Sequence, residues 1–160
     1  MDQYTRRIVG FAVHAGVLDG LSVCRMLNQI LAAAAPYPMT LSTDHDPLFE
    51  FHRWKANLRI LEITEIKSVP LVPMSHPFIE RLIGTIRREL LAQIPFWHAD
   101  DLERKLSGFR DYYNEARVHH PLGGITPRMR LGTDNRQLVS LADYRWQRHC
   151  RGLFQLPEAA

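Results

Sequence analysis

Two carboxylates, Asp44 and Glu80, have the strongest claim to chemistry in this sequence. Asp44 lies in the polar turn 43–47, directly after a short predicted strand, and Glu80 lies near the start of a predicted helix, with 35 residues between them. Taken one at a time, each has an ordinary structural interpretation. An Asp after a strand caps a turn or helix, and a Glu in a first helical turn faces the helix dipole. Both are candidates for carboxylate-based catalysis that need support from the surrounding sequence.

The elements that must position Asp44 alternate between strand and helix. β-Branched and aromatic residues predict a strand at the N-terminus. Asp19 or Ser22 then caps a helix whose apolar residues recur at helical spacing until Pro36. The predicted order is strand 6–14, this helix, strand 39–42, helix 49–58 and strand 60–66. Such an alternation favours an α/β fold with some parallel strand pairing.

Glu80 belongs to a predominantly helical second half. The prolines in 68–77 predict an irregular loop, and Pro77 suits the first position of a helix, where its missing N–H costs nothing. An apolar stripe follows this helix, and a second helix is predicted over 99–116. We therefore expect a core domain over 1–130 and a basic C-terminal extension over 131–160.

The composition is that of a globular protein with one ordinary domain. The chain has 160 residues, of which 46% are hydrophobic and 23% charged. No apolar run approaches the roughly 18 residues that a membrane span needs, and no leader is recognisable. Cys24 and Cys150 lie outside any metal-binding spacing, so we expect reduced, structural cysteines. A cytoplasmic protein without a membrane partner is expected.

Basic residues are concentrated in the last third of the chain. The net charge of +3 is too small to identify a partner, but ten of the twenty Lys and Arg residues lie between Arg104 and Arg151. Most of these are Arg, whose guanidinium pairs with phosphate through two hydrogen bonds. This distribution fits contact with a polyanion, and it equally fits a solvated helical face.

Motifs around the two carboxylates point to one family. The matching segments are Ser42-Thr43-Asp44-His45-Asp46, then Glu80 within 77–89, then 113–119 with Thr126-Pro127, and 2–10 at the start. In their order and spacing they resemble the catalytic core of DDE-family insertion-sequence transposases and retroviral-type integrases. Bacterial insertion-sequence transposases are the most similar. The matches run from Asp2 to about Pro127.

That resemblance implies a fold, a chemistry and partners. The fold is ribonuclease-H-like, with a mixed five-stranded sheet flanked by helices. The chemistry is metal-dependent phosphoryl transfer on DNA, in which Asp44 and Glu80 are catalytic and hold two Mg²⁺ (or Mn²⁺) ions roughly 3.5–4 Å apart. Hard cations select carboxylate oxygens. The implied function is DNA integration or transposition by the full-length form, near the bacterial nucleoid, as a homo-oligomer or with an intact transposase.

The resemblance also implies a DNA-facing surface beside Glu80. At 100° per residue, Glu80, Gly84 and Arg87 share one helix face, and Arg88 lies next to it. Arg87 is about 10 Å along the axis from Glu80, which suits a backbone phosphate beside the scissile bond. An exposed Arg neutralised by Glu89 is the competing interpretation. Weaker DNA-binding candidates border the same loop and helix: Lys67, His76 and Arg81.

A DDE site needs a third carboxylate, on the first strand of its sheet. Asp2 precedes Asp44 by 41 intervening residues, but it matches the second-strand motif of the family. We therefore expect an N-terminally truncated core that lacks the first strand and its Asp, so that enzymatic activity of this chain alone stays open. The alternative function is a non-enzymatic transposase remnant that binds DNA non-specifically or associates with an intact transposase.

Overall fold

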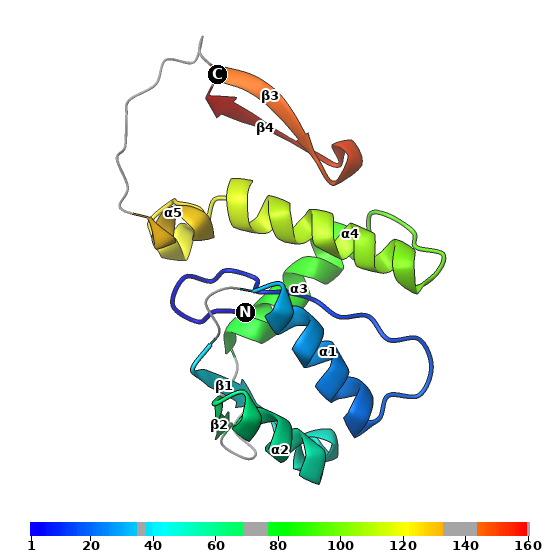
Figure 1. Ribbon diagram of the computed structural model, residues 1–160. Coiled ribbons are helices and arrows are strands. Elements are labelled where there is room, and N and C mark those ends of the chain that lie inside the picture. The colour runs from blue at the N-terminus through cyan, green and yellow to red at the C-terminus, as the bar shows by residue number, and fades with distance from the viewer. Residues whose placement is uncertain (35–37, 69–76, 133–143, 160) are drawn as a thin grey trace. The chain divides into compact units, whose positions relative to one another are not determined.

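The computed structural model describes residues 1–34, 38–68, 77–132 and 144–159, which divide into two units (Figure 1). One unit is the continuous segment Ala12–Ala99, here called the central unit. The other, here called the terminal unit, combines Met1–Phe11 with Asp100–Ala160. Within the described ranges, no helix is both long and apolar enough to cross a membrane. The carboxylates of interest, Asp44 and Glu80, both belong to the central unit.

A small parallel sheet lies in the central unit. Strand β1 (Thr40–Thr43) pairs with β2 (Thr64–Lys67), and the connection between them holds the 3₁₀-helix η1 (Pro47–Glu50) and helix α2 (His52–Ile60). The strand predicted over 39–42 is therefore confirmed to within one residue. The strand predicted over 60–66 forms only in its second half, because α2 continues to Ile60 and Glu62 adopts a positive φ of 56° that turns the chain.

Helix α1 (Gly20–Ala32) and α2 supply the apolar core of the central unit. Of the two predicted caps, Asp19 and Ser22, the structure has Asp19, whose carboxylate accepts from the Ser22 N–H at 2.7 Å. Trp54 is almost fully buried at the centre of this core, with Phe49 tilted against its ring at 5.0 Å. The other buried members are Cys24, Leu31, Leu58 and Ile63. This core fixes the two short strands that precede and follow α2.

Helix α3 (Pro77–Ile86) begins at the predicted proline and continues into the π-helix η3 (Arg87–Leu91). The Ala92 N–H donates to the Arg87 carbonyl at 2.9 Å, which is the five-residue spacing of a π-turn. The apolar stripe predicted for this helix is buried at Leu82, Ile86 and Leu90. The prediction is wrong for its other two members, Ile79 and Ile83, which are exposed. The predicted loop before Pro77 falls mostly on 69–76, and the predicted helix stop at Pro36 on 35–37, both outside the described residues.

The terminal unit contains the second predicted helix and an antiparallel hairpin. Helix α4 (Ala99–Asp111) continues into the π-helix η4 (Tyr112–Ala116), which confirms the helix predicted over 99–116. Short helices η5 (His120–Leu122) and α5 (Pro127–Leu131) follow. Strands β3 (Tyr144–His149) and β4 (Phe154–Ala159) pair across the turn η7 (Cys150–Gly152). Both cysteines are free, as expected, and burial raises the pKa of the Cys150 thiol to about 11.

The strand predicted over 6–14 is wrong. These residues form no strand, although Ile8 is fully buried. The apolar, β-branched composition correctly indicates burial, but the Ile8 backbone is hydrogen-bonded to a side chain, that of Asn114, and not to a neighbouring strand. Within the described ranges the strands form two two-stranded sheets, a smaller arrangement than the five-stranded sheet that the resemblance implies.

Candidate active site

Asp44 lies immediately after β1, where its backbone is tied to the end of β2. The Ser68 N–H donates to the Thr43 carbonyl at 2.9 Å, and the Lys67 ammonium donates to the Asp44 carbonyl at 3.2 Å. On the other side, His45 Nε2 lies 2.7 Å from the Ser68 carbonyl, so that nitrogen carries the proton in this contact. The main chain at Thr43 and Asp44 and the side chain of His45 are thus held by the last residue of β2 and the residue after it.

The side chain of Asp44 is exposed, and one of its two carboxylate oxygens accepts a hydrogen bond from a neighbouring residue. Its Oδ1 accepts from the Asp46 N–H at 3.1 Å, which forms a local turn. Asp46 in turn caps η1, because its Oδ1 accepts from the Leu48 N–H at 2.9 Å. The two aspartates of this turn therefore differ: Asp46 starts a helix, and Asp44 keeps an exposed carboxylate at the carboxyl end of a strand.

Lys67 is the positively charged residue in contact with the turn that contains Asp44. Its ammonium lies 3.1 Å from Glu50 Oε1 and 3.2 Å from Glu65 Oε1, and its side chain is only 25% exposed. Burial by itself lowers the pKa of Lys67, but the hydrogen bonds to Glu50 and Glu65 outweigh it, so the pKa is raised. The sequence-based DNA-binding role for Lys67 remains a prediction, and the structure gives this side chain an internal role as well.

Glu65 links the Lys67 ammonium to the core. Its Oε1 accepts from the Thr43 hydroxyl at 2.6 Å and from the Trp54 indole N–H at 3.0 Å. Burial raises the pKa of Glu65, but the hydrogen bonds from Thr43, Trp54 and Lys67 outweigh it and lower the pKa overall. Sequence reasoning missed both Glu50 and Glu65. The signal for Glu65 was the period of two in β2, which places Glu65 and Lys67 on one face of the strand.

Glu80 occupies the first turn of α3, where the helix dipole favours a negative charge. Its side chain is exposed, because Leu82 and Ile86 turn the opposite side of the helix inward. No hydrogen bond or ion pair joins Glu80 to Asp44 in the described ranges. Exposed carboxylate oxygens on two elements fit the donor preference of a hard divalent cation. A cluster of three or more possible metal ligands does not occur among the described residues.

Three of the five basic residues predicted to face DNA lie on α3 and η3, and a fourth, Lys67, ends β2. Arg81, Arg87 and Arg88 are all exposed. The Arg88 guanidinium lies over Gly84, since a Cβ built at Gly84 would stand 3.1 Å from Arg88 Nη1. Gly84 thus leaves room for the guanidinium on the helix line that also contains Glu80. The fifth DNA-binding candidate, His76, is outside the described residues.

The carboxylate of Asp2 is used in a turn of the terminal unit. Its Oδ1 accepts from the Tyr4 N–H at 2.8 Å, and its Oδ2 accepts from the Thr5 hydroxyl at 2.7 Å. Burial raises the pKa of Asp2, but these hydrogen bonds outweigh it and lower the pKa. Both oxygens therefore have structural partners. The interpretation of Asp2 as a residue outside the catalytic set stays a prediction.

Comparison with known proteins finds similarity to integrase core domains. Residues 61–127 match the model of the integrase core domain family. An uncharacterized 31.7 kDa protein of insertion element IS407 from Burkholderia multivorans is 28% identical over 131 residues, which are 79% of this chain and 45% of that protein. The catalytic core domain of BIV integrase is 25% identical, with a TM-score of 0.53 over 73% of this chain and 75% of that one. In these comparisons the chain is similar to integrase cores and to a protein of an insertion element.

A second solved structure supports the same fold. It is the simian T-cell lymphotropic virus intasome in complex with PP2A regulatory subunit B56 gamma, which matches 92% of this chain and 58% of its own chain with a TM-score of 0.61. A sequence identity of 19% supports similarity of fold and nothing further. The ribonuclease-H-like α/β class is thereby confirmed. The chain spans less than half the length of the insertion-element relative that it matches.

Proposed function

We propose that this integrase core takes part in metal-dependent phosphoryl transfer on DNA, with Asp44 and Glu80 as two of its catalytic carboxylates. The observation that carries the proposal is the way Asp44 is held. The carbonyls of Thr43 and Asp44 accept hydrogen bonds from Ser68 and Lys67, and the His45 side chain contacts the Ser68 carbonyl, while the Asp44 carboxylate stays exposed. A rigid backbone with an open acidic side chain is what a preorganised cation site needs.

The roles of the individual residues follow from their chemistry. Asp44 and Glu80 would hold divalent cations, Mg²⁺ or Mn²⁺, through carboxylate oxygens. The bound cations would activate the attacking water or 3′-hydroxyl and stabilise the leaving oxygen. Lys67 forms ion pairs with Glu50 and Glu65, which reduces the repulsion between these carboxylates and Asp44. Arg87 and Arg88 bind backbone phosphates and thereby place the DNA strand beside Glu80.

The proposal also includes the binding partners of the chain and its location in the cell. The chain acts on DNA, as part of a homo-oligomer or together with an intact transposase, in the bacterial cytoplasm. The arginines of α3 and η3 contact phosphates and not base edges, so binding has little sequence preference. Lys67, Arg81 and His76 contribute to this contact from the same helix and from the segment before it.

Mn²⁺ binding to the purified chain tests the two carboxylates. We expect weak binding in the wild type, and loss of most of it in Asp44→Asn and in Glu80→Gln, because each change keeps the side-chain shape and removes the charge. Asp46→Asn and Glu89→Gln are matched controls on the same turn and the same helix, and they should bind as the wild type does. Equal affinity in Asp44→Asn and Asp46→Asn would overturn the assignment. Circular dichroism shows whether each variant is folded.

A second candidate function is DNA binding without chemistry. The observation that favours it is Asp2, whose two oxygens are bonded within their own turn and so are not free to complete a three-carboxylate site. Single-turnover cleavage of a labelled DNA end, with Mg²⁺ or Mn²⁺, separates the two candidates. Cleavage that Asp44→Asn abolishes supports the catalytic proposal, whereas DNA binding without any cleavage supports the second candidate.

A further inference from the structure

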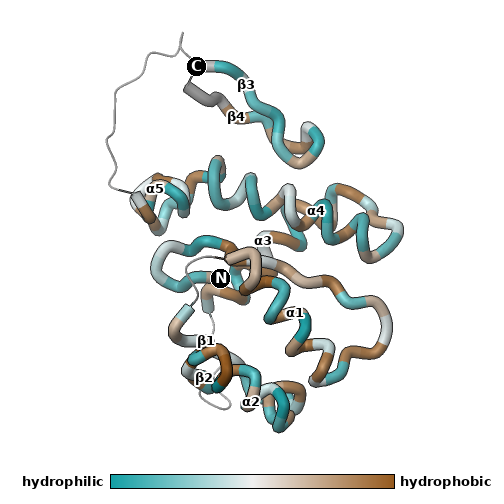
Figure 2. Tube along the Cα trace, viewed as in Figure 1, coloured by the Kyte–Doolittle hydropathy of each residue, from teal (hydrophilic) through white to brown (hydrophobic). Residues whose placement is uncertain are grey.

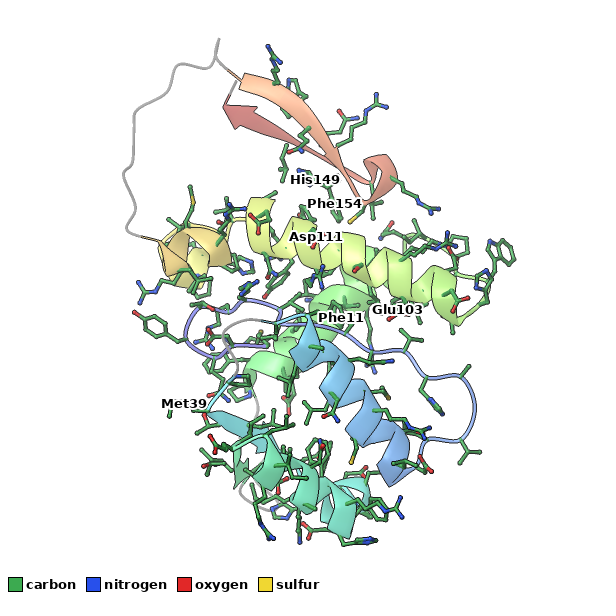
Figure 3. The ribbon with its side chains drawn as sticks, in the orientation of Figure 1. Phe11, Met39, Glu103, Asp111, His149 and Phe154 are labelled. Carbon is green, nitrogen blue, oxygen red and sulfur yellow. The ribbon has the colours of Figure 1, made fainter. Side chains whose placement is uncertain are left out.

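The β3–β4 hairpin of the terminal unit has one anchored face. Opposite residues of an antiparallel pair share a face, and His149 is opposite Phe154. The Phe154 ring stacks on Tyr112 of η4 with 4.1 Å between centroids, and the His149 ring lies 5.6 Å from the same tyrosine. Figure 3 labels His149 and Phe154 on the hairpin. These ring contacts attach the hairpin to the helix through its inner face. The opposite face of the ribbon is therefore the outer one.

The outer face presents an unsupported aromatic side chain. Trp146 and Arg148 alternate with the inner residues and so project together on this side. Trp146 is 71% exposed, and Arg148 is exposed beside it. Neither side chain has a hydrogen bond, ion pair or ring contact to any residue that the structure describes. An indole left in water at the middle of a strand costs free energy, which a partner with a flat apolar surface would recover.

The charge of the hairpin selects a polyanion as that partner. Its basic residues are Arg145, Arg148 and Arg151, against the single acidic residue Glu158. Figure 2 shows β3 as hydrophilic along its length. Arg151 stands in the turn with a positive φ of 58°, next to Cys150 with a φ of 50°, both in the left-handed region that ordinary side chains rarely adopt. Such a backbone, held at the tip of a basic ribbon, is a strained feature of the kind found at binding sites.

We propose that the outer face of the β3–β4 hairpin binds unpaired DNA, with Trp146 stacking on a base and Arg148 binding a phosphate of the same strand. The two residues are about 7 Å apart along the strand, which suits contact with adjacent parts of one nucleotide strand. Base stacking on an aromatic ring requires a base that is not already stacked in a duplex, which is why unpaired DNA is favoured over duplex DNA. The choice of DNA as the polyanion rests on the proposed function.

Binding of a fluorescent oligothymidylate, measured by anisotropy, tests the hairpin surface. We expect Trp146→Ala to weaken binding about tenfold, because stacking on one ring is lost. Trp146→Phe should retain much of the affinity, and Arg148→Ala should reduce the salt dependence by about one phosphate contact. The matched controls are Trp97→Ala and Arg59→Ala, two exposed residues of the central unit that should leave binding unchanged.

Two results would overturn the inference. One is equal affinity in Trp146→Ala and Trp97→Ala; the other is binding of duplex DNA with no measurable binding of the oligothymidylate. Neither result bears on Mn²⁺ binding, which tests Asp44 and Glu80 separately and should be the same in Trp146→Ala as in the wild type. Circular dichroism of Trp146→Ala shows whether the variant is folded.

Discussion

The side-chain amide of Asn114 binds both backbone polar groups of Ile8, across 106 residues of sequence. Asn114 Oδ1 accepts from the Ile8 N–H at 2.8 Å, and Asn114 Nδ2 donates to the Ile8 carbonyl at 2.9 Å. An amide side chain therefore supplies the two hydrogen bonds that a neighbouring strand would supply in a sheet. Both residues are buried, so neither set of polar groups has water as an alternative.

Replacement of Asn114 by Ala should destabilise the protein by about 3 kcal/mol, because two buried backbone groups lose their partners. Urea unfolding measures the change. Asn57 is the matched control: its amide exchanges hydrogen bonds with Asn28 on the surface, so Asn57→Ala should cost less than about 1 kcal/mol. Equal losses in the two variants would contradict the role of the Ile8 contact.

Glu65→Gln should change how the free energy of unfolding depends on pH. The folded-state pKa of Glu65 is lowered from its ordinary value of 4.5, so its ionised form contributes stability that is present above that value and is lost as the pH falls through the folded pKa. The difference in unfolding free energy between wild type and Glu65→Gln should therefore be constant near neutral pH and shrink below about pH 4.5. Urea titrations between pH 7 and pH 3 measure it, and a difference independent of pH would exclude the charge of Glu65 as its source.

Gly84→Ala should have opposite effects on stability and on DNA binding. Alanine inside a helix is favoured over glycine by about 0.5–1 kcal/mol, and the atom that its Cβ would meet is the movable end of Arg88. The unfolding free energy should therefore rise, while duplex DNA binding weakens because the guanidinium is displaced from its position over the helix. Gly108→Ala is the control, because a Cβ there would contact nothing within 4 Å. Unchanged DNA affinity in Gly84→Ala would exclude a role for the position of Arg88.

Replacement of Arg87 and Arg88 by Ala together should weaken duplex binding and flatten its salt dependence, because up to two phosphate contacts are removed. Anisotropy at several salt concentrations measures both quantities. Arg104 and Arg110 of α4, replaced in the same way, control for the loss of two positive charges from an exposed helix. A double variant at Arg87 and Arg88 with the wild-type salt slope would rule out phosphate contacts by these two residues.

Local sequence patterns predicted the elements around the candidate site well. Asp19 as a helix cap, Pro77 as a helix start and the strand before Asp44 were all visible, because each depends on a few adjacent residues. The interpretation of 6–14 as a strand failed because a strand requires a partner, and no local pattern reveals that Asn114 takes the place of one. The Lys67–Glu65–Trp54 contacts were missed for the same reason, since they join residues from two different elements.

The π-turns that follow α3 and α4 affect where homologous chains can gain or lose a residue. In η3 and in η4 the closing bond spans five residues, from Ala92 to Arg87 and from Arg117 to Tyr112. A π-turn contains one residue more than the α-helical turn it replaces. Deletion of one residue inside 87–91 would thus restore a continuous α-helix and keep Glu80 in its first turn. Homologous chains can differ by one residue at this point without losing the helix, so gaps in an alignment are expected here and not between Pro77 and Ile86.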